Sequence, residues 1–152
     1  MRSEDSPPAV SSRRRRQQSG MTLVELMIVV TVLAILGSIA IPSYQAYVQK
    51  ARRSDARMVL VRAAQLLERL ATESAGTGYA GANLATLGVA TSENLHYDVT
   101  FAAPPTAAAF TLVAAPKAGG SQVSDGCSSF TITQAGVRGV SGGAALTAEQ
   151  CW

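Results

Sequence analysis

The hydrophobic positions of this chain change their spacing twice along its length, and each change predicts a different kind of element. Residues 21–41 are apolar on every side, with Glu25 as their one charge. A helix of that length spans about 30 Å, which is the thickness of the hydrocarbon layer of a bilayer. The segment therefore predicts a helix long and apolar enough to cross a membrane.

The next stretch, residues 56–71, has apolar residues on one side only. They fall within about 120° of arc at helical spacing, with charged residues and glutamine on the other side. These apolar positions are Val59, Leu60, Ala63, Leu67, Leu70 and Ala71. Gly76 and Gly78 end the pattern. We predict one continuous helix that runs from the membrane into a domain, with Pro42 as the place where a kink can form.

Beyond a connection rich in Gly, Ala and Thr, apolar and polar residues alternate, which is the spacing of a strand. This alternation predicts strands at 95–101, 110–115 and 130–133, and a further short strand around 137–140. The short links between them favour an antiparallel sheet, and the amphipathic helix has the apolar face to cover it. The predicted fold class is α+β, with a long N-terminal helix packed on a small antiparallel sheet.

Charge lies in blocks along the chain. The first twenty residues hold five arginines, four of them at 13–16, against two acids, which equals the whole net charge of +3. Arginines directly before an apolar helix favour a cytoplasmic N-terminus. A second basic block at 50–69 has two interpretations, a solvated helix flank near an anionic membrane surface or a contact for DNA. Beyond residue 70 acidic residues outnumber basic ones, which makes the DNA interpretation the less favoured one.

A secretory signal peptide is the alternative to a retained helix. Such a peptide has an apolar core of about 7–15 residues and ends in small residues, as at 38–40. Here the apolar segment is longer, and the helical pattern resumes at Tyr44 with no break after Ala40. These two observations favour a helix that stays attached.

Two cysteines, Cys127 and Cys151, permit a single pairing. In an exported domain a disulfide is expected, whereas in the cytosol free thiols or part of a metal site would be expected. His96 lies on the polar side of a predicted strand, and one histidine with two cysteines is too few ligands for a closed zinc site. No nucleophile–base spacing or phosphate-binding glycine loop stands out. The sequence therefore predicts no enzyme, no cofactor and no metal.

Three features resemble the type IV pilin family. Residues 20–26, GMTLVEL, resemble the prepilin cleavage motif of a glycine, an apolar residue and a glutamate five positions beyond the glycine. The apolar run through Pro42 to Tyr44 resembles the pilin stem, and the two cysteines resemble the pair that closes the C-terminal loop of pilins. Parts of the head resemble PilE-like minor pilins: residues 47–57, 110–116, 127–142 and 151–152. Met21 departs from the commoner phenylalanine at the cut, and the leader is longer than most.

The resemblance implies a pilin fold with a disulfide between Cys127 and Cys151. It divides the chain into a leader peptide (1–20), a transmembrane and filament-core helix (21–52) and a head domain (53–152).

The resemblance also implies a sequence of events. Prepilin peptidase would cut after Gly20 and methylate the amine of Met21. The subunit would wait in the inner membrane, and the pilus assembly machinery there would move it into an extracellular filament of pilin subunits. The expected function is that of a structural, minor subunit of a type IV pilus that serves adhesion, twitching motility or DNA uptake. The alternatives are a DNA-binding pilin displayed on the filament and a type II secretion pseudopilin.

Glu25 has a physical rationale of its own. A carboxylate at the centre of a bilayer costs roughly 2.5–3.5 kcal/mol on insertion scales and needs a partner. Cleavage creates one, the amine of Met21, which is charged near neutral pH. The pair can form within one helix, at i and i+4, or between neighbouring subunits, as the resemblance implies. A misaligned subunit would leave one charge buried alone, so we predict that Glu25 sets the register of assembly. The alternative is an acid near the lipid headgroups with no role.

Overall fold

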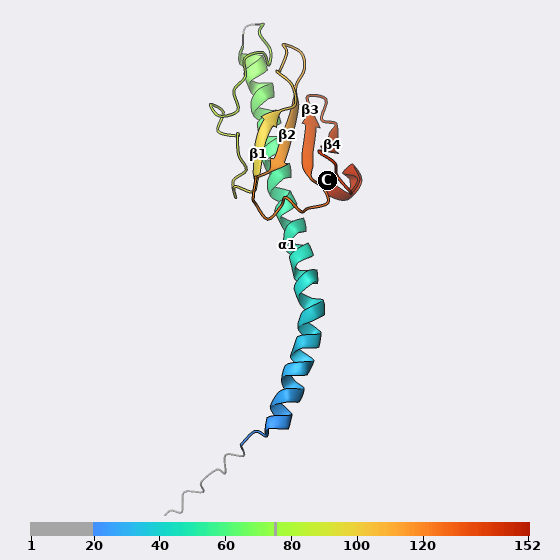
Figure 1. The fold of residues 1–152 in the computed structure, drawn as a ribbon. Coiled ribbons are helices and arrows are strands. Elements are labelled where there is room, and N and C mark those ends of the chain that lie inside the picture. Colours follow the sequence, from blue (N-terminus) through green and yellow to red (C-terminus); the bar gives the residue numbers. More distant parts are fainter. Residues whose placement is uncertain (1–19, 75) are drawn as a thin grey trace, which may run out of the picture. The chain divides into compact units, whose positions relative to one another are not determined.

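The computed structural model describes residues 20–74 and 76–152 (Figure 1). The chain divides into two compact units, Met1–Ala40 and Ile41–Trp152, and each is described by itself. Apart from Gly20, the predicted leader lies outside the described residues.

One helix, α1, runs from Leu23 to Glu73 over 51 residues, which confirms the predicted continuous helix. The hydroxyl oxygen of Thr22 accepts a hydrogen bond from the backbone N–H of Glu25 at 3.2 Å, as an N-terminal cap does. The helix continues through Pro42, although proline has no N–H to donate to the preceding turn. A kink at this position stays a prediction.

In the first unit, the described residues 20–40 form an apolar helix with no core of their own. All of them are exposed except Gly37, which is partly covered. Leu23 is 74% and Ile39 69% exposed. By length and composition this part of α1 is able to cross a membrane.

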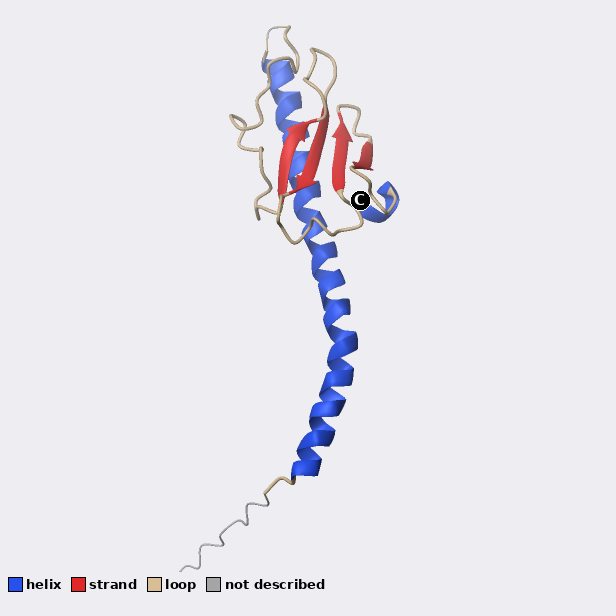
Figure 2. Ribbon diagram, in the orientation of Figure 1, coloured by secondary structure: helices blue, strands red, loops and turns tan. Residues whose placement is uncertain are grey.

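The second unit is a four-stranded antiparallel sheet with the C-terminal part of α1 packed across one face (Figure 2). Its strands are β1 (Tyr97–Phe101), β2 (Thr111–Pro116), β3 (Ser129–Thr133) and β4 (Arg138–Ser141), in the order β1-β2-β3-β4. The strands alternate in burial as a half-buried sheet should. The buried side chains between the helix and the sheet include Ala56, Leu60, Ala63, Leu67, Tyr97, Val99, Leu112, Ala114, Phe130 and Ile132.

The predicted start of the first strand is wrong at Leu95. This residue has a left-handed backbone with φ of 57°, and its side chain is 58% exposed. The reason is a tight turn around the buried Ser92, whose hydroxyl oxygen accepts hydrogen bonds from the backbone N–H groups of His96 and Tyr97. These bonds hold the chain in a turn up to His96, so the strand begins only at Tyr97.

The chain ends in a short helix, α2 (Ala148–Cys151), which no sequence pattern predicted. The side-chain carbonyl of Gln150 accepts a hydrogen bond from the backbone N–H of Thr147 at 3.1 Å, which closes the first turn. A disulfide joins Cys127 to Cys151 across 24 positions, as expected. Trp152 packs edge-to-face on Phe130 at a centroid distance of 5.9 Å.

Candidate functional site

The candidate cleavage site lies at the exposed entrance to α1. Gly20, Met21 and Thr22 precede the helix without regular structure, and Met21 is 62% exposed. A methyl group added to Gly20 would meet no atom within 4 Å. The fold therefore places no demand for glycine at this position, and a requirement for glycine would have to come from a processing enzyme that binds the segment. Cleavage after Gly20 and methylation of Met21 remain predictions.

Glu25 lies in the first turn of α1, where a negative charge is favoured by the helix dipole. Its side chain is exposed, and it makes no ion pair within the described residues. Its sequence neighbours Val24 and Leu26 are 64% and 53% exposed. Glu25 is thus a single acid on an apolar surface that this unit leaves uncovered.

The apolar surface beside Glu25 is hollowed. Five residues of the same helix line a shallow hollow of about 320 Å³, namely Val24, Met27, Ile28, Thr31 and Val32. A hollow lined by branched and unbranched apolar side chains can receive the side chains of another apolar helix. The arrangement is suited to helix packing, either among lipids or among neighbouring subunits.

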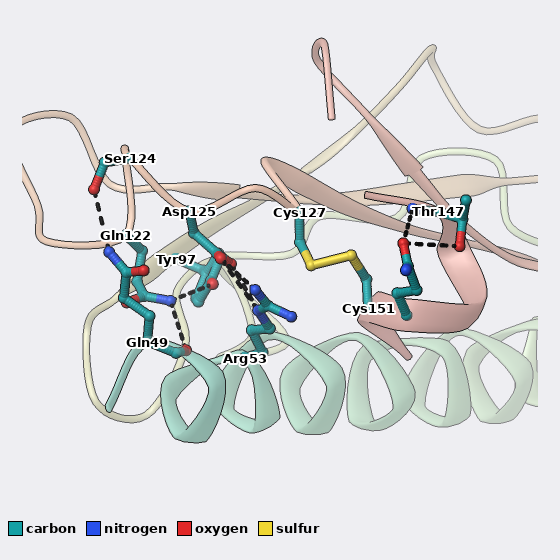
Figure 3. Close-up of polar contacts among 10 residues, drawn as sticks. Gln49, Arg53, Tyr97, Gln122, Ser124, Asp125, Cys127, Thr147 and Cys151 are labelled. Carbon is teal, nitrogen blue, oxygen red and sulfur yellow. Dashed lines mark hydrogen bonds and ion pairs between the residues drawn. A yellow bond between two sulfur atoms is a disulfide. The ribbon is translucent and has the colours of Figure 1, made fainter. Parts of the chain in front are cut away.

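In the second unit, a polar cluster that we call the head clamp joins α1 to the loop between β2 and β3 (Figure 3). Arg53 donates two nearly parallel hydrogen bonds to Asp125, at 2.7 Å from Nη2 to Oδ1 and 3.0 Å from Nε to Oδ2. The side chain of Arg53 is 13% exposed and that of Asp125 is 1% exposed. Gln122 extends the clamp, because its Nε2 donates to the backbone carbonyl of Gln49 at 3.1 Å and to the hydroxyl of Tyr97 at 3.0 Å.

Burial, more than the clamp, sets the acidity of Tyr97. The pKa of Tyr97 is raised above its ordinary value, first by burial and then by the nearby carboxylates of Asp125 and Asp55. The hydrogen bond from Gln122 and the charge of Arg53 act in the opposite direction without cancelling the rise. Tyr97 therefore stays a neutral hydroxyl that anchors the loop.

Half of the basic block at 50–69 is used inside the chain, so its interpretation as a solvated flank is wrong for three of its six members, Arg52, Arg53 and Arg57. Arg52 donates to Ser121, Arg53 pairs with Asp125 and Arg57 donates to the carbonyl of Trp152 at 2.7 Å. Arg69 pairs with Glu73 at 2.8 Å on the exposed side of the helix. The remaining two, Lys50 and Arg62, are exposed and have no hydrogen-bond or ion-pair partner in the part of the chain that is described. Arg52, Arg53 and Arg57 thus attach the rest of the head to its helix, and the other three members remain a solvated flank.

Sequence reasoning missed this clamp. Asp125-Gly126 reads in the sequence as a turn, but Asp125 is buried and lies 72 positions from its partner Arg53. Spacing along one element cannot reveal such a pair. The proximity of Asp125 to Cys127 was the one available signal, since a disulfide fixes the loop that carries it.

His96 is partly buried in the turn before β1 and not in the strand where it was predicted, and its backbone N–H donates to the hydroxyl oxygen of Ser92. In residues 20–74 and 76–152, no group of three or more His, Cys, Asp or Glu side chains is placed to hold a metal ion. The two cysteines are joined to each other and so offer no thiol.

Comparison with known proteins gives two family matches that together cover most of the described chain. The family described as type IV minor pilin ComP, DNA uptake sequence receptor, matches residues 42–131. The prokaryotic N-terminal methylation motif matches residues 15–41. The second match spans Gly20, Met21 and Glu25, and the first covers the stem of the head and most of the sheet.

Curated relatives are similar over shorter stretches. Prepilin peptidase-dependent protein D of Escherichia coli is 42% identical over 60 residues, which is 40% of this chain and 41% of that protein. A fimbrial protein of Pseudomonas aeruginosa is 36% identical over 86 residues, 57% of this chain and 50% of its own length. The type IV major pilin protein PilE of Neisseria gonorrhoeae is 49% identical over 39 residues, 26% of this chain and 23% of its own length. The chain spans half or less of the length of these relatives.

Proposed function

Because this chain belongs to the family of type IV minor pilins described for ComP, we propose that it is cut after Gly20, methylated at Met21 and assembled through its apolar helix into an extracellular pilus. Before assembly it is held in the inner membrane with its N-terminus in the cytoplasm. Its partners are prepilin peptidase, the inner-membrane assembly machinery and other pilin subunits. It acts as a structural subunit and not as an enzyme.

The observation that carries this proposal is the uncovered apolar helix with one acid at its start. Between Gly20 and Ala40 only Gly37 is even partly covered, and so large an apolar surface requires lipid or other apolar helices around it. A filament core made of such helices supplies that environment after the subunit leaves the membrane. The head has its own core and needs no such partner.

Glu25 supplies the register in this proposal. Once the bond after Gly20 is cut, the amine of Met21 is a positive charge close to the carboxylate in sequence. In a dry core the attraction between opposite charges is strong, and a buried charge without a partner is costly. A neighbouring subunit whose amine meets Glu25 is therefore favoured over one that is displaced along the helix axis.

The test is the recovery of variants in sheared filaments. Glu25→Ala should reach the membrane and be processed normally, but its incorporation should fall at least about ten-fold, the effect of roughly 1.4 kcal/mol. Glu149→Ala is the matched control, because it removes an exposed acid of α2 far along the sequence and should be incorporated normally. Equal recovery of both variants would reject the role of Glu25.

A second function, DNA binding during uptake, is favoured by the description of the matching family as a DNA uptake sequence receptor. In this chain the exposed and uncommitted basic side chains available for phosphate contacts include Lys50, Arg62 and Lys117. Binding through them should weaken as salt rises, because neutralised phosphates release counterions. A gel shift with residues 41–152, the compact unit that contains the core, tests this at low and high salt. Absence of a shift at low salt would remove the DNA function and leave the structural one.

A further inference from the structure

The head carries two exposed apolar corners that its own core does not use. At the first corner, Met58 is 57% and Leu95 is 58% exposed. Both line one hollow of about 310 Å³ on the side of α1 next to the turn before β1. At the second corner, Val137 is 63% exposed and precedes the exposed Arg138 in the turn between β3 and β4. The pair at the first corner borders a hollow that an apolar side chain of another molecule can fill, and Val137 is a single exposed apolar side chain of that kind.

The first corner is built in a way that holds an apolar side chain in water. Leu95 keeps a left-handed backbone, which is uncommon for any residue with a Cβ and is found where a site needs it. Asp55 of α1 holds this turn in place. Its Oδ1 accepts hydrogen bonds from the backbone and side-chain N–H groups of Asn94 at 3.3 and 3.1 Å. The core gains little from this arrangement, because more than half of the leucine stays exposed.

The two corners lie diagonally across the sheet. β1 and β4 are its two edge strands, and every neighbouring pair of strands is antiparallel (Figures 1 and 2). In a four-stranded antiparallel sheet the first and fourth strands run in opposite directions, so their starts lie at opposite ends. Leu95 lies two positions before the start of β1, and Val137 directly precedes the start of β4. One corner is therefore at one edge and end, and the other corner is at the opposite edge and opposite end.

This placement matches what a filament requires. Subunits related by a rotation and a rise meet through two different patches, one on each partner, and the contact repeats without closing. Corners at opposite edges and opposite ends of the sheet provide two different patches of this kind.

The charges at the two corners are complementary. The residues that line the hollow beside Leu95 include Asp55, Glu93 and Arg62, and because Asp55 is buried and bound by Asn94, Glu93 is the carboxylate that the hollow presents to a partner. Glu93 is exposed and has no hydrogen-bond or ion-pair partner among the described residues. Arg138 lies with its guanidinium carbon 5.2 Å from the ring centroid of Trp152 and makes no ion pair within the same residues. The second corner thus presents an apolar residue next to an arginine, and the first corner presents an apolar pair next to a glutamate.

We infer that the hollow at Met58 and Leu95 receives the β3–β4 turn of a second copy of this chain. Val137 of that copy lies against Met58 and Leu95, and its Arg138 approaches Glu93. The inference rests on the proposed function, because it needs the subunits to be brought together in a filament. It adds the head surface that one subunit offers to the next.

Cysteine cross-linking of the full chain in filaments tests the contact. The double variant Leu95→Cys/Val137→Cys should give a ladder of linked subunits after mild oxidation and a non-reducing gel of sheared filaments. The matched control is Leu95→Cys/Val123→Cys, because Val123 is as exposed, at 59%, but lies in the loop between β2 and β3. The control pair and each single cysteine should give no ladder.

Charge exchange provides a second readout. Glu93→Arg should lower incorporation into filaments at least several-fold, and Arg138→Glu in the same chain should restore it. Filaments that contain the 95/137 cysteine variant without a ladder, or with a ladder no stronger than that of the 95/123 control, would overturn this contact and leave the proposed function standing. Absence of even the unaltered chain from sheared filaments would overturn the proposed function, and the contact with it.

Discussion

The ion pair of the head clamp provides a sharp test of how the head is held to its helix. Asp125→Ala removes the carboxylate and leaves the guanidinium of Arg53, with a side chain only 13% exposed, without its partner. Removing one partner of a buried pair costs about 3–5 kcal/mol. Because Arg53 keeps some contact with water, we expect the lower end, about 3 kcal/mol. For a domain of this size that corresponds to a fall in Tm of roughly 12–20 °C.

Urea unfolding of residues 41–152, with the disulfide closed, measures this change. Arg69→Ala is the matched control, because Arg69 lies on the same helix and its ion pair with Glu73 is exposed, with side chains 73% and 60% accessible. Its midpoint should not move measurably, since exposed ion pairs contribute little. The double variant Arg53→Met/Asp125→Ala should recover part of the loss, because it leaves no unpaired charge. Equal midpoints for Asp125→Ala and Arg69→Ala would refute the assignment of the clamp as a stabilising contact.

Three further predictions concern other parts of the chain. Gly20→Ala should be processed better than Gly20→Phe in a membrane assay of cleavage, since nothing in the fold restricts the position, and normal processing of Gly20→Phe would argue against cleavage there. Reduction of the bond between Cys127 and Cys151, which are 24 positions apart, should lower the free energy of unfolding by about 3–3.5 kcal/mol, and an unchanged urea midpoint in reductant would contradict this. Burial raises the pKa of Tyr97, so the folded state holds this proton to a higher pH than the unfolded state, and stability should fall as pH rises above about 10. Tyr97→Phe should make that fall shallower in unfolding measured across this range, and an identical pH profile would remove the explanation.

The helix and the strand pattern could be predicted because both depend on local periodicity. The apolar run at 21–41 and the one-sided pattern at 56–71 continue as a single helix, α1. Alternation placed Leu112, Ala114, Phe130 and Ile132 in the core, where all four are buried. The α+β class and the covering of the sheet by the helix followed from these two patterns.

What could not be predicted depends on contacts between distant residues. Alternation alone would place Leu95 in β1, but hydrogen bonds to the hydroxyl of Ser92 hold it in a turn. Arg53 and Arg57 look like part of a solvated helix flank until the folded head brings Asp125 and Trp152 to them. The short helix α2 could not be predicted, because it depends on the disulfide and on the first-turn bond of Gln150 and not on a periodic pattern.

The candidate cleavage site is a different case. Gly20, Met21 and Glu25 stand out in the sequence because the fold gives no reason for them. Gly20 is not required by its backbone, and Glu25 has no ion-pair partner within the described residues. Residues that break a local rule without benefit to their own chain indicate an interaction with another molecule. We propose that these interactions are with the processing enzyme and with neighbouring subunits.

The central claim is that the chain enters a filament only after its arginine-rich start has been removed. N-terminal sequencing combined with intact mass measurement of sheared filaments tests it directly. We expect a polypeptide that begins with N-methylated Met21 and keeps Glu25. A filament subunit that begins at Ile41, or that still carries Arg13 to Arg16, would contradict the account.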